Sequence, residues 1–182
     1  MPDTKTAIID LAEELIRTKG FHSFSYRDIA VMLKIKNAAI HYYFPSKTDL
    51  GIAVIERAIQ SFEKNVQKWQ KLPEAQQFER FTRFYTESYK KGWVCLMGAL
   101  SASYETYPEK IQLKIKQMGS SILKWLEQCL EKGRKKRMFD FKGPSADKAL
   151  LLVSDLLSSL LLSKVMGGKV FTTIQKQVLQ SL

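Results

Sequence analysis

The sequence predicts an all-α protein of about nine helices, three short ones at the N-terminus and six mostly longer ones after them. Apolar residues recur at helical spacing through nearly the whole chain, and glycine, proline or capping residues separate the periodic segments. No stretch alternates apolar and polar residues as a half-buried strand does. With 182 residues, of which 45% are hydrophobic, the chain can form at most two modest globular domains.

The first three helices are short and closely spaced. An apolar stripe predicts a first helix that ends at Gly20, because glycine commonly ends helices. Ser25, followed three residues later by Asp28, resembles a capping box and predicts the start of the second helix. Residues 34–36 form a tight connection to a third helix over 37–44.

The later helices are bounded mainly by proline and glycine. The periodicity places them at about 46–71, 74–91, 95–106, 108–137, 146–166 and 170–182. A shift in composition near residue 50 predicts two domains, residues 1–50 and 51–182, with one helix crossing the boundary without a linker.

The chain is strongly basic, with a net charge of +11 and a pI of about 9.6, which suggests a polyanionic partner. Residues 19–47 form a local basic patch with a net charge of +4, but most of the surplus lies after residue 50. The run KGRKKR at 132–137 fits a cationic helix C-terminus with solvated lysines. Contact of this run with an acidic ligand or DNA is the alternative.

The sequence does not support an enzyme, a metal-binding protein or a membrane protein. We see no nucleophile–base pair, no metal-ligand set and no glycine-rich phosphate loop, so we expect no catalytic residue and no metal. Cys95 and Cys129 are expected to be free thiols. The longest apolar run, 149–162, is interrupted by polar residues, and acids interrupt the apolar stretch at the N-terminus. These observations predict a cytoplasmic protein with no membrane partner.

The second and third short helices, joined by so tight a turn, are typical of a helix-turn-helix, here over about 26–45. The second helix of that motif enters the DNA major groove. Ile40 and Phe44 would face inward, whereas Asn37 and His41, four residues apart, share a different face. Asparagine pairs with adenine, alanine methyls contact thymine methyls, and tyrosine and lysine suit phosphates. The residues of this stretch with such side chains are Lys36, Asn37, Ala38, Ala39, Tyr42 and Tyr43, and His41 is added to them because it shares the face of Asn37.

Residues 5–50 resemble the N-terminal domain of the TetR/AcrR family of bacterial transcriptional regulators. The matching features are Gly20-Phe21, Tyr26-Arg27-Asp28-Ile29-Ala30, Ile35, Ile40, Tyr42-Tyr43-Phe44-Pro45-Ser46-Lys47 and Leu50. After residue 50 the likeness is mainly architectural. It implies a C-terminal domain whose middle helices enclose an inducer pocket and whose last two helices form a four-helix dimer interface.

The resemblance also implies roles for single residues. Arg27 would reach a base or a phosphate, and Tyr26 beside it is included in the DNA-binding set. The positions of Asn37, Ala39 and His41 would face bases. Those of Tyr42, Tyr43 and Lys47 would hold phosphates.

Three positions depart from the family pattern. Lys34 stands where the turn glycine is usual, which predicts a strained or altered turn. Lys36 replaces the usual capping serine and cannot accept a hydrogen bond, but it could contact a phosphate. His41 replaces the common tyrosine on the reading face.

Two further surfaces are candidates in the C-terminal domain. Aromatic and methionine side chains could line an effector pocket, although such stripes are more often core; they are Phe62, Phe81, Tyr85, Tyr89, Met97, Tyr104, Met118 and Trp125. The helix over 146–166 is apolar on more than one side, which predicts a partner helix from a second chain. Its candidate interface residues are Leu150, Val153, Leu157, Leu160 and Leu161.

Together these patterns predict a sequence-specific DNA-binding transcriptional regulator, a repressor that responds to a small-molecule effector and binds a palindromic operator as a homodimer. We expect no cofactor other than that effector. The alternatives are a nucleoid-type protein that binds DNA with low specificity and an enzyme built in the C-terminal bundle.

Overall fold

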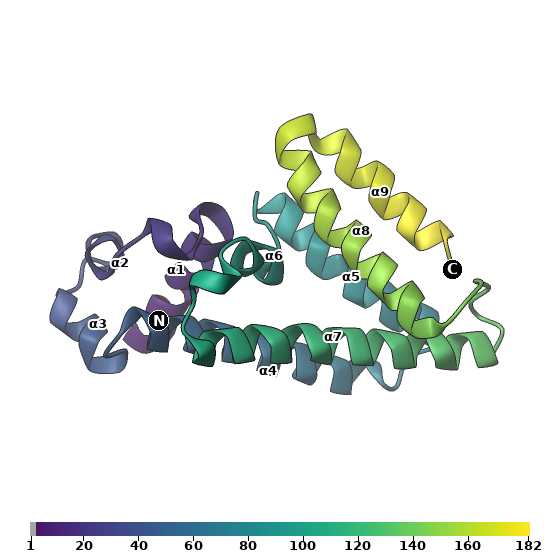
Figure 1. Ribbon diagram of the computed structural model, residues 1–182, viewed down its shortest axis with the longest axis horizontal. Coiled ribbons are helices and arrows are strands. Elements are labelled where there is room, and N and C mark those ends of the chain that lie inside the picture. The colour runs from purple at the N-terminus through teal and green to yellow at the C-terminus, as the bar shows by residue number, and fades with distance from the viewer. Residues whose placement is uncertain (1–2) are drawn as a thin grey trace. The chain divides into compact units, whose positions relative to one another are not determined.

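The computed structural model describes residues 3–182, and these form nine α-helices and two short 3-10 helices without a strand (Figure 1). The all-α prediction is therefore confirmed. The helices are α1 (Thr4–Lys19), η1 (Phe21–Ser23), α2 (Tyr26–Leu33), α3 (Asn37–Tyr43), α4 (Lys47–Trp69), α5 (Glu74–Lys90), α6 (Leu96–Ser101), η2 (Tyr104–Thr106), α7 (Glu109–Lys135), α8 (Ser145–Met166) and α9 (Gly168–Gln180).

The chain folds into two compact units. The first contains the residues up to Gln60 together with Leu96–Met118, and the second contains Ser61–Cys95 and Gly119–Leu182. Both α4 and α7 pass from one unit to the other. The functional boundary that the sequence suggested near residue 50 stays a prediction.

Local caps define the short helices of the first unit. The Asp3 carboxylate accepts a 2.7 Å hydrogen bond from the Thr6 amide and caps α1. Ser25 and Asp28 form the expected capping box at the start of α2. Because these helices are short, tertiary burial must stabilise them. Large, fully buried side chains of α1 to α3 and of the start of α4 form the core here: Ile8, Ile16, Ile29, Ile40, Leu50 and Ile55.

The predicted helix over 95–106 is wrong in its extent. In the structure α6 ends at Ser101, and η2 follows after a turn. The Gln112 side-chain amide donates 3.1 Å hydrogen bonds to the carbonyls of Tyr104 and Tyr107. This side chain therefore holds the segment between η2 and α7, which follows the break.

The second unit is built on α5, α8, α9 and the later parts of α4 and α7. Figure 1 shows α8 and α9 side by side, joined at Gly167, whose φ of 89° favours glycine. Phe171 of α9 is fully buried and stacks on Tyr89 of α5 with ring centroids 4.3 Å apart. The Gln175 side chain donates a 2.6 Å hydrogen bond to the Thr86 hydroxyl, so α9 is fixed to α5 by polar and aromatic contacts.

Candidate nucleic-acid interface

The turn between α2 and α3 is built on Lys34, which adopts the left-handed conformation with φ 55° and ψ 41°. The Lys34 and Ile35 amides donate to the carbonyls of Val31 and Ala30, which satisfies the end of α2. Lysine disfavours this conformation, so the strain predicted from the sequence is present. The turn nevertheless keeps the shape that a glycine would give it.

The start of α3 lacks a side-chain cap. Lys36 occupies the N-cap position in an extended conformation and makes no side-chain hydrogen bond to the helix. Because α3 has only seven residues, it depends on contacts with its neighbours. Ile40 supplies the main one, since its side chain is fully buried.

Tyr26 links the start of α2 to the end of α3. Its side chain is buried, and its hydroxyl donates a 2.9 Å hydrogen bond to the backbone carbonyl of Phe44. Burial is the main reason that the pKa of Tyr26 rises to about 12, so the hydroxyl keeps its proton. A contact between Tyr26 and DNA stays a prediction, whereas its role in this bond is direct. No sequence pattern indicates this bond, because the acceptor is a backbone atom 18 residues away.

Residues expected to read bases lie on an exposed face of α3. Asn37, Ala38 and His41 are exposed, and Ala39 is half-buried. The edge of the His41 ring meets Tyr26 at a centroid distance of 4.8 Å, and Nδ1 lies 3.4 Å from the Pro45 carbonyl oxygen. These contacts orient the imidazole and leave Nε2 as the nitrogen that can meet a ligand.

The phosphate-binding candidates differ in their exposure. Tyr42 is 82% exposed, and its ring meets that of Tyr43 edge-on. Arg27 and Lys36 are also exposed. Lys47 is different, because its ammonium group donates a short hydrogen bond to the Phe24 carbonyl inside the domain.

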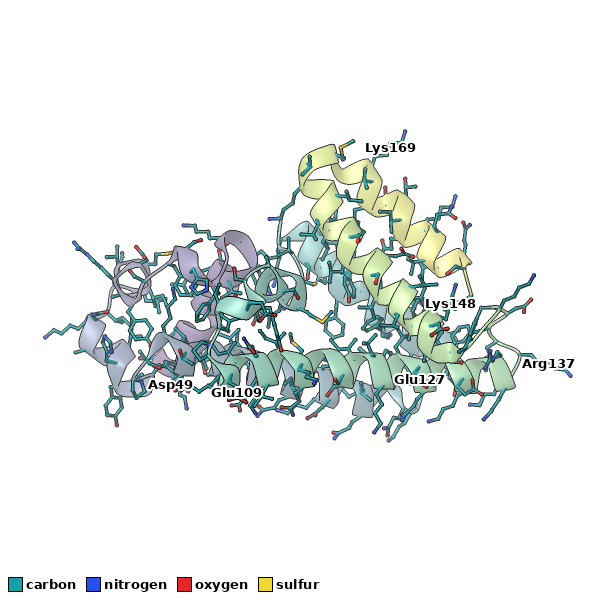
Figure 2. The ribbon with its side chains drawn as sticks, viewed as in Figure 1. Asp49, Glu109, Glu127, Arg137, Lys148 and Lys169 are labelled. Carbon is teal, nitrogen blue, oxygen red and sulfur yellow. The ribbon has the colours of Figure 1, made fainter. Side chains whose placement is uncertain are left out.

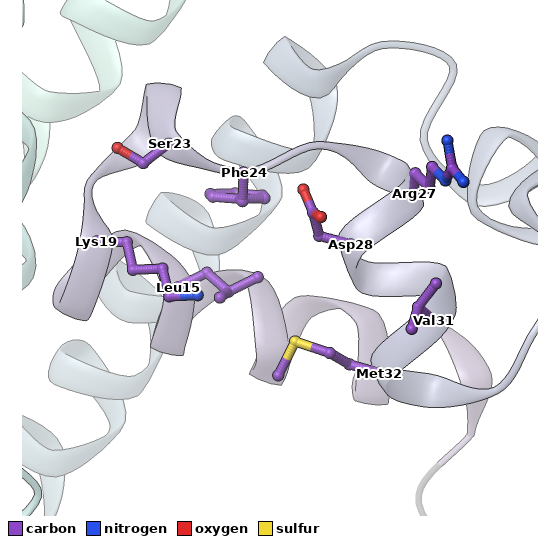
Figure 3. Close-up of a pocket in the computed structure, with 8 residues that line it drawn as sticks. All are labelled: Leu15, Lys19, Ser23, Phe24, Arg27, Asp28, Val31 and Met32. Atoms are coloured by element: carbon purple, nitrogen blue, oxygen red, sulfur yellow. The ribbon is translucent and has the colours of Figure 1, made fainter.

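A groove of about 280 Å³ lies between α1 and α2 of the same domain (Figure 3). Figure 3 shows Phe24 and Asp28 beside one another and Arg27 pointing away from them. None of the predicted effector-pocket residues lines the groove, which consists of Leu15, Lys19, Ser23, Phe24, Arg27, Asp28, Val31 and Met32.

His22 joins this domain to the segment that follows α6. The His22 Nε2 atom lies 2.9 Å from the Thr106 hydroxyl oxygen, and the His22 ring stacks on Tyr107. The Thr106 hydroxyl donates to the Ser103 carbonyl, so it accepts its hydrogen bond from His22. Sequence reasoning missed this contact, because residues 84 positions apart carry no local signal.

The predicted effector-pocket residues are divided between the two units. Met97, Tyr104 and Met118 belong to the first unit and the other five to the second. In the second unit Phe62, Phe81 and Trp125 form one aromatic cluster with Trp69, with centroid distances of 5.3–6.4 Å. Phe81 and Trp69 are buried, whereas Phe62 and Trp125 are only half-buried. The role of this cluster as a pocket stays a prediction.

The dimer candidates on α8 fall into two groups. Val153 and Leu160 are buried in the chain's own core, and Leu157 is half-buried. Leu150 and Leu161 are exposed, together with four apolar neighbours that the sequence analysis did not select, Leu151, Leu162, Val165 and Met166. By length and apolar composition α8 could cross a membrane, but the core helix of a soluble protein passes the same test.

The basic run at the end of α7 is partly engaged within the second unit. Lys136 pairs with the buried Glu74 at 2.7 Å, and Arg134 and Lys135 both pair with Glu131. Figure 2 shows Arg137 at the end of this segment, where its side chain is exposed.

A buried three-helix core, a tight turn and an exposed polar face on the second helix of the pair define a helix-turn-helix DNA-binding domain. Residues 8–54 match the sequence model of the family described as bacterial regulatory proteins, tetR family. Residues 8–54 are therefore a DNA-binding domain of the tetR family, and the whole chain is similar to transcriptional regulators of that family.

Relatives extend the likeness over the whole chain. A TetR transcriptional regulator from Legionella pneumophila has 29% sequence identity and a TM-score of 0.90, with 100% of this chain and 98% of that one covered. The HTH-type transcriptional repressor NemR of Escherichia coli strain K12 is 22% identical over 169 residues, which are 90% of this chain and 85% of NemR. AibR, solved in complex with isovaleryl coenzyme A and operator DNA, shares the fold, with a TM-score of 0.77 at 16% identity and with 99% and 98% of the two chains covered.

Proposed function

We propose that the chain is a ligand-responsive repressor that binds a roughly palindromic operator as a dimer, in the cytoplasm. The observation that carries DNA reading is the face of α3 on which Asn37 and His41 are exposed while Ile40 is buried. The burial fixes the rotation of the helix, so the polar residues face outward together. The similarity to the repressor NemR supports repression rather than activation of transcription.

Most exposed side chains of α3 have a proposed partner on the DNA. Asn37 would bind adenine through both its amide oxygen and nitrogen, and Ala38 and Ala39 would let the helix approach thymine methyl groups. Tyr42 and Tyr43 would donate to phosphates on either side of the groove. Arg27 would reach the DNA backbone from the start of α2.

Dimerisation would give the operator its symmetry. Two copies of α3 reading successive major-groove faces lie about 34–36 Å apart, so the half-sites would be one helical turn apart. The exposed apolar side chains of α8 support a partner helix, because burial of such side chains stabilises association.

The effector would bind in the second unit. Its half-exposed rings Phe62 and Trp125 offer flat apolar surface beside the buried Phe81, which suits an apolar or aromatic molecule. The ligand-bound complex of AibR supports effector control of a related fold. Such a molecule regulates DNA binding only if its affinity differs between the DNA-bound and free states.

The experiment that tests DNA reading is selection of bound sequences from random DNA, with wild-type protein and Asn37→Ala in parallel. We expect an inverted repeat for the wild type. The variant should bind about 1–3 kcal/mol more weakly to that repeat and lose preference at one base pair of each half-site. Equal affinity for all sequences in the wild type would instead indicate a nucleoid-type protein.

Effector control is tested by a thermal-shift screen of small apolar molecules. A ligand at 100 times its Kd stabilises the folded protein by about 2.7 kcal/mol. The hit should release the operator and lose its stabilising effect on Trp125→Ala. A hit that stabilises this variant equally would place the effector elsewhere.

A further inference from the structure

The Lys47 ammonium group lies against Phe21 and Phe24 of the DNA-binding domain, and the Lys47 side chain is half-buried. Lys47 begins α4, and its Nζ atom donates a hydrogen bond to the Phe24 carbonyl oxygen. The same atom lies 4.3 Å from the centroid of the Phe24 ring and 5.0 Å from that of Phe21. The two ring faces and the carbonyl replace part of the water around this half-buried cation.

The pKa of Lys47 agrees with a half-buried ammonium group. Loss of water on burial lowers the pKa of Lys47, and the Asp28 carboxylate acts in the opposite direction. Lys34 and Lys36, on the turn, are exposed. Lys47 is therefore the lysine near α3 that is already bound within the protein.

The group that Lys47 holds is the connector between α1 and α2, residues 20–25. Phe21 of this connector is buried and meets Tyr107 edge-on at 5.3 Å. It also packs so closely on Gly51 that a Cβ there would lie 2.7 Å from the ring. At the other end, Ser25 caps α2 through the box with Asp28.

The connector sets where α2 begins. Arg27 lies in the first turn of α2. The hydrogen bond from Tyr26 to Phe44 links the position of α3 to that of α2. Loss of the hydrogen bond from Lys47 to Phe24 would therefore leave the positions of α2 and α3 less well defined.

We propose that Lys47 is a positioning residue, which supports DNA binding by fixing the connector to the start of α4 and does not neutralise a phosphate. This inference rests on the proposed DNA-binding function and replaces the phosphate contact that the sequence suggested for Lys47. A phosphate contact would require the ammonium to leave the carbonyl and both rings.

The test compares Lys47→Met, which keeps the length of the side chain and removes its charge, with Lys36→Met as the exposed control. Operator affinity is measured at several salt concentrations, and the melting temperature on the same samples. We expect Lys47→Met to melt several degrees lower and to raise Kd by about tenfold at every salt concentration, with the salt slope unchanged. Lys36→Met should melt as the wild type does. A slope lower by about one unit in Lys47→Met would overturn the proposal, as would an unchanged melting temperature.

Lysine labelling of the wild-type protein with acetic anhydride gives a second test that needs no variant. We expect Lys47 to react more slowly than Lys34 and Lys36 in the free protein, with no change when operator is added. Protection of Lys47 that appears only with operator would overturn the proposal. Should the wild type fail to bind DNA specifically, the melting and free-protein labelling results still test the contact, while the proposed function fails.

Discussion

The Tyr26 hydroxyl and the Phe44 carbonyl oxygen are joined by a buried hydrogen bond of 2.9 Å, which closes the helix-turn-helix across its two ends. Tyr26→Phe removes the donor and leaves the carbonyl without this partner. We expect a loss of about 1–3 kcal/mol in the free energy of unfolding, measured by urea denaturation. Tyr42→Phe is the matched control, because the Tyr42 side chain is 82% exposed. Equal stability of Tyr26→Phe and wild type would show that the bond contributes nothing.

The same tyrosine predicts sensitivity to alkali. Burial raises the pKa of Tyr26 to about 12 in the folded state, above the ordinary tyrosine pKa of 10.0. In the unfolded chain the hydroxyl therefore ionises first, so stability is full below pH 10 and falls as the pH rises towards 12. Tyr26→Phe should lose this part of the pH dependence. Unfolding curves between pH 8 and pH 11 measure it, and identical slopes in the two proteins would contradict the assignment.

Lys34 predicts a stabilising substitution. Its φ of 55° costs a lysine about 1–2 kcal/mol but costs a glycine almost nothing. Lys34→Gly should therefore raise the free energy of unfolding by up to about 1 kcal/mol, because glycine also gives the unfolded chain more freedom. Lys36→Gly, at a position of φ −73°, is the control and should not stabilise. A less stable Lys34→Gly would mean that the lysine side chain supports the turn.

Local patterns predicted most of the fold. The capping box at Ser25 and the end of α1 at Gly20 follow from residues a few positions apart, so the sequence alone was enough. The segment between η2 and α7 is held by Gln112, whose side chain satisfies carbonyls five and eight residues earlier. A short-range pattern cannot include that contact.

The candidate site was predictable in its outline but not in the direction of each side chain. Asn37 and His41 share an exposed face because helical spacing requires it. Tyrosine and lysine, however, have apolar bodies and polar ends, so either can turn inward when a partner lies nearby. Tyr26 and Lys47 both do so, towards backbone carbonyls whose positions only the fold reveals.

Glu74 and Lys136 predict a second dependence on pH. Glu74 is 4% exposed and its Oε2 atom has no partner, while the hydrogen bond from Lys136 is the main cause that lowers its pKa. Stability from this pair is present above the pKa of an unfolded glutamate and is lost as the pH falls through the lower folded value. Lys136→Met should cost about 1 kcal/mol at pH 7, a modest loss because Lys136 is largely exposed, and the difference from wild type should shrink below pH 4.

The control for that pair is Lys135→Met, since the Lys135 side chain is 74% exposed and its nearest carboxylate oxygen lies 3.5 Å away. It should match the wild type at every pH. A Lys136→Met difference that stays constant from pH 7 to well below pH 4 would show that the loss is not caused by the Glu74 charge.

The exposed apolar face of α8 predicts the assembly state. Leu161 is 44% exposed in a single chain, so glutamate at this position can fold in the monomer but would place a charge in an apolar interface. We expect Leu161→Glu to sediment as a monomer and to lose most operator affinity. Leu157 is half-buried, and we expect Leu157→Glu to have the same effects. Leu113→Glu on α7, at a leucine that is 58% exposed, is the control and should keep the mass of the wild type. A dimer that persists in Leu161→Glu and Leu157→Glu would place the interface on another face.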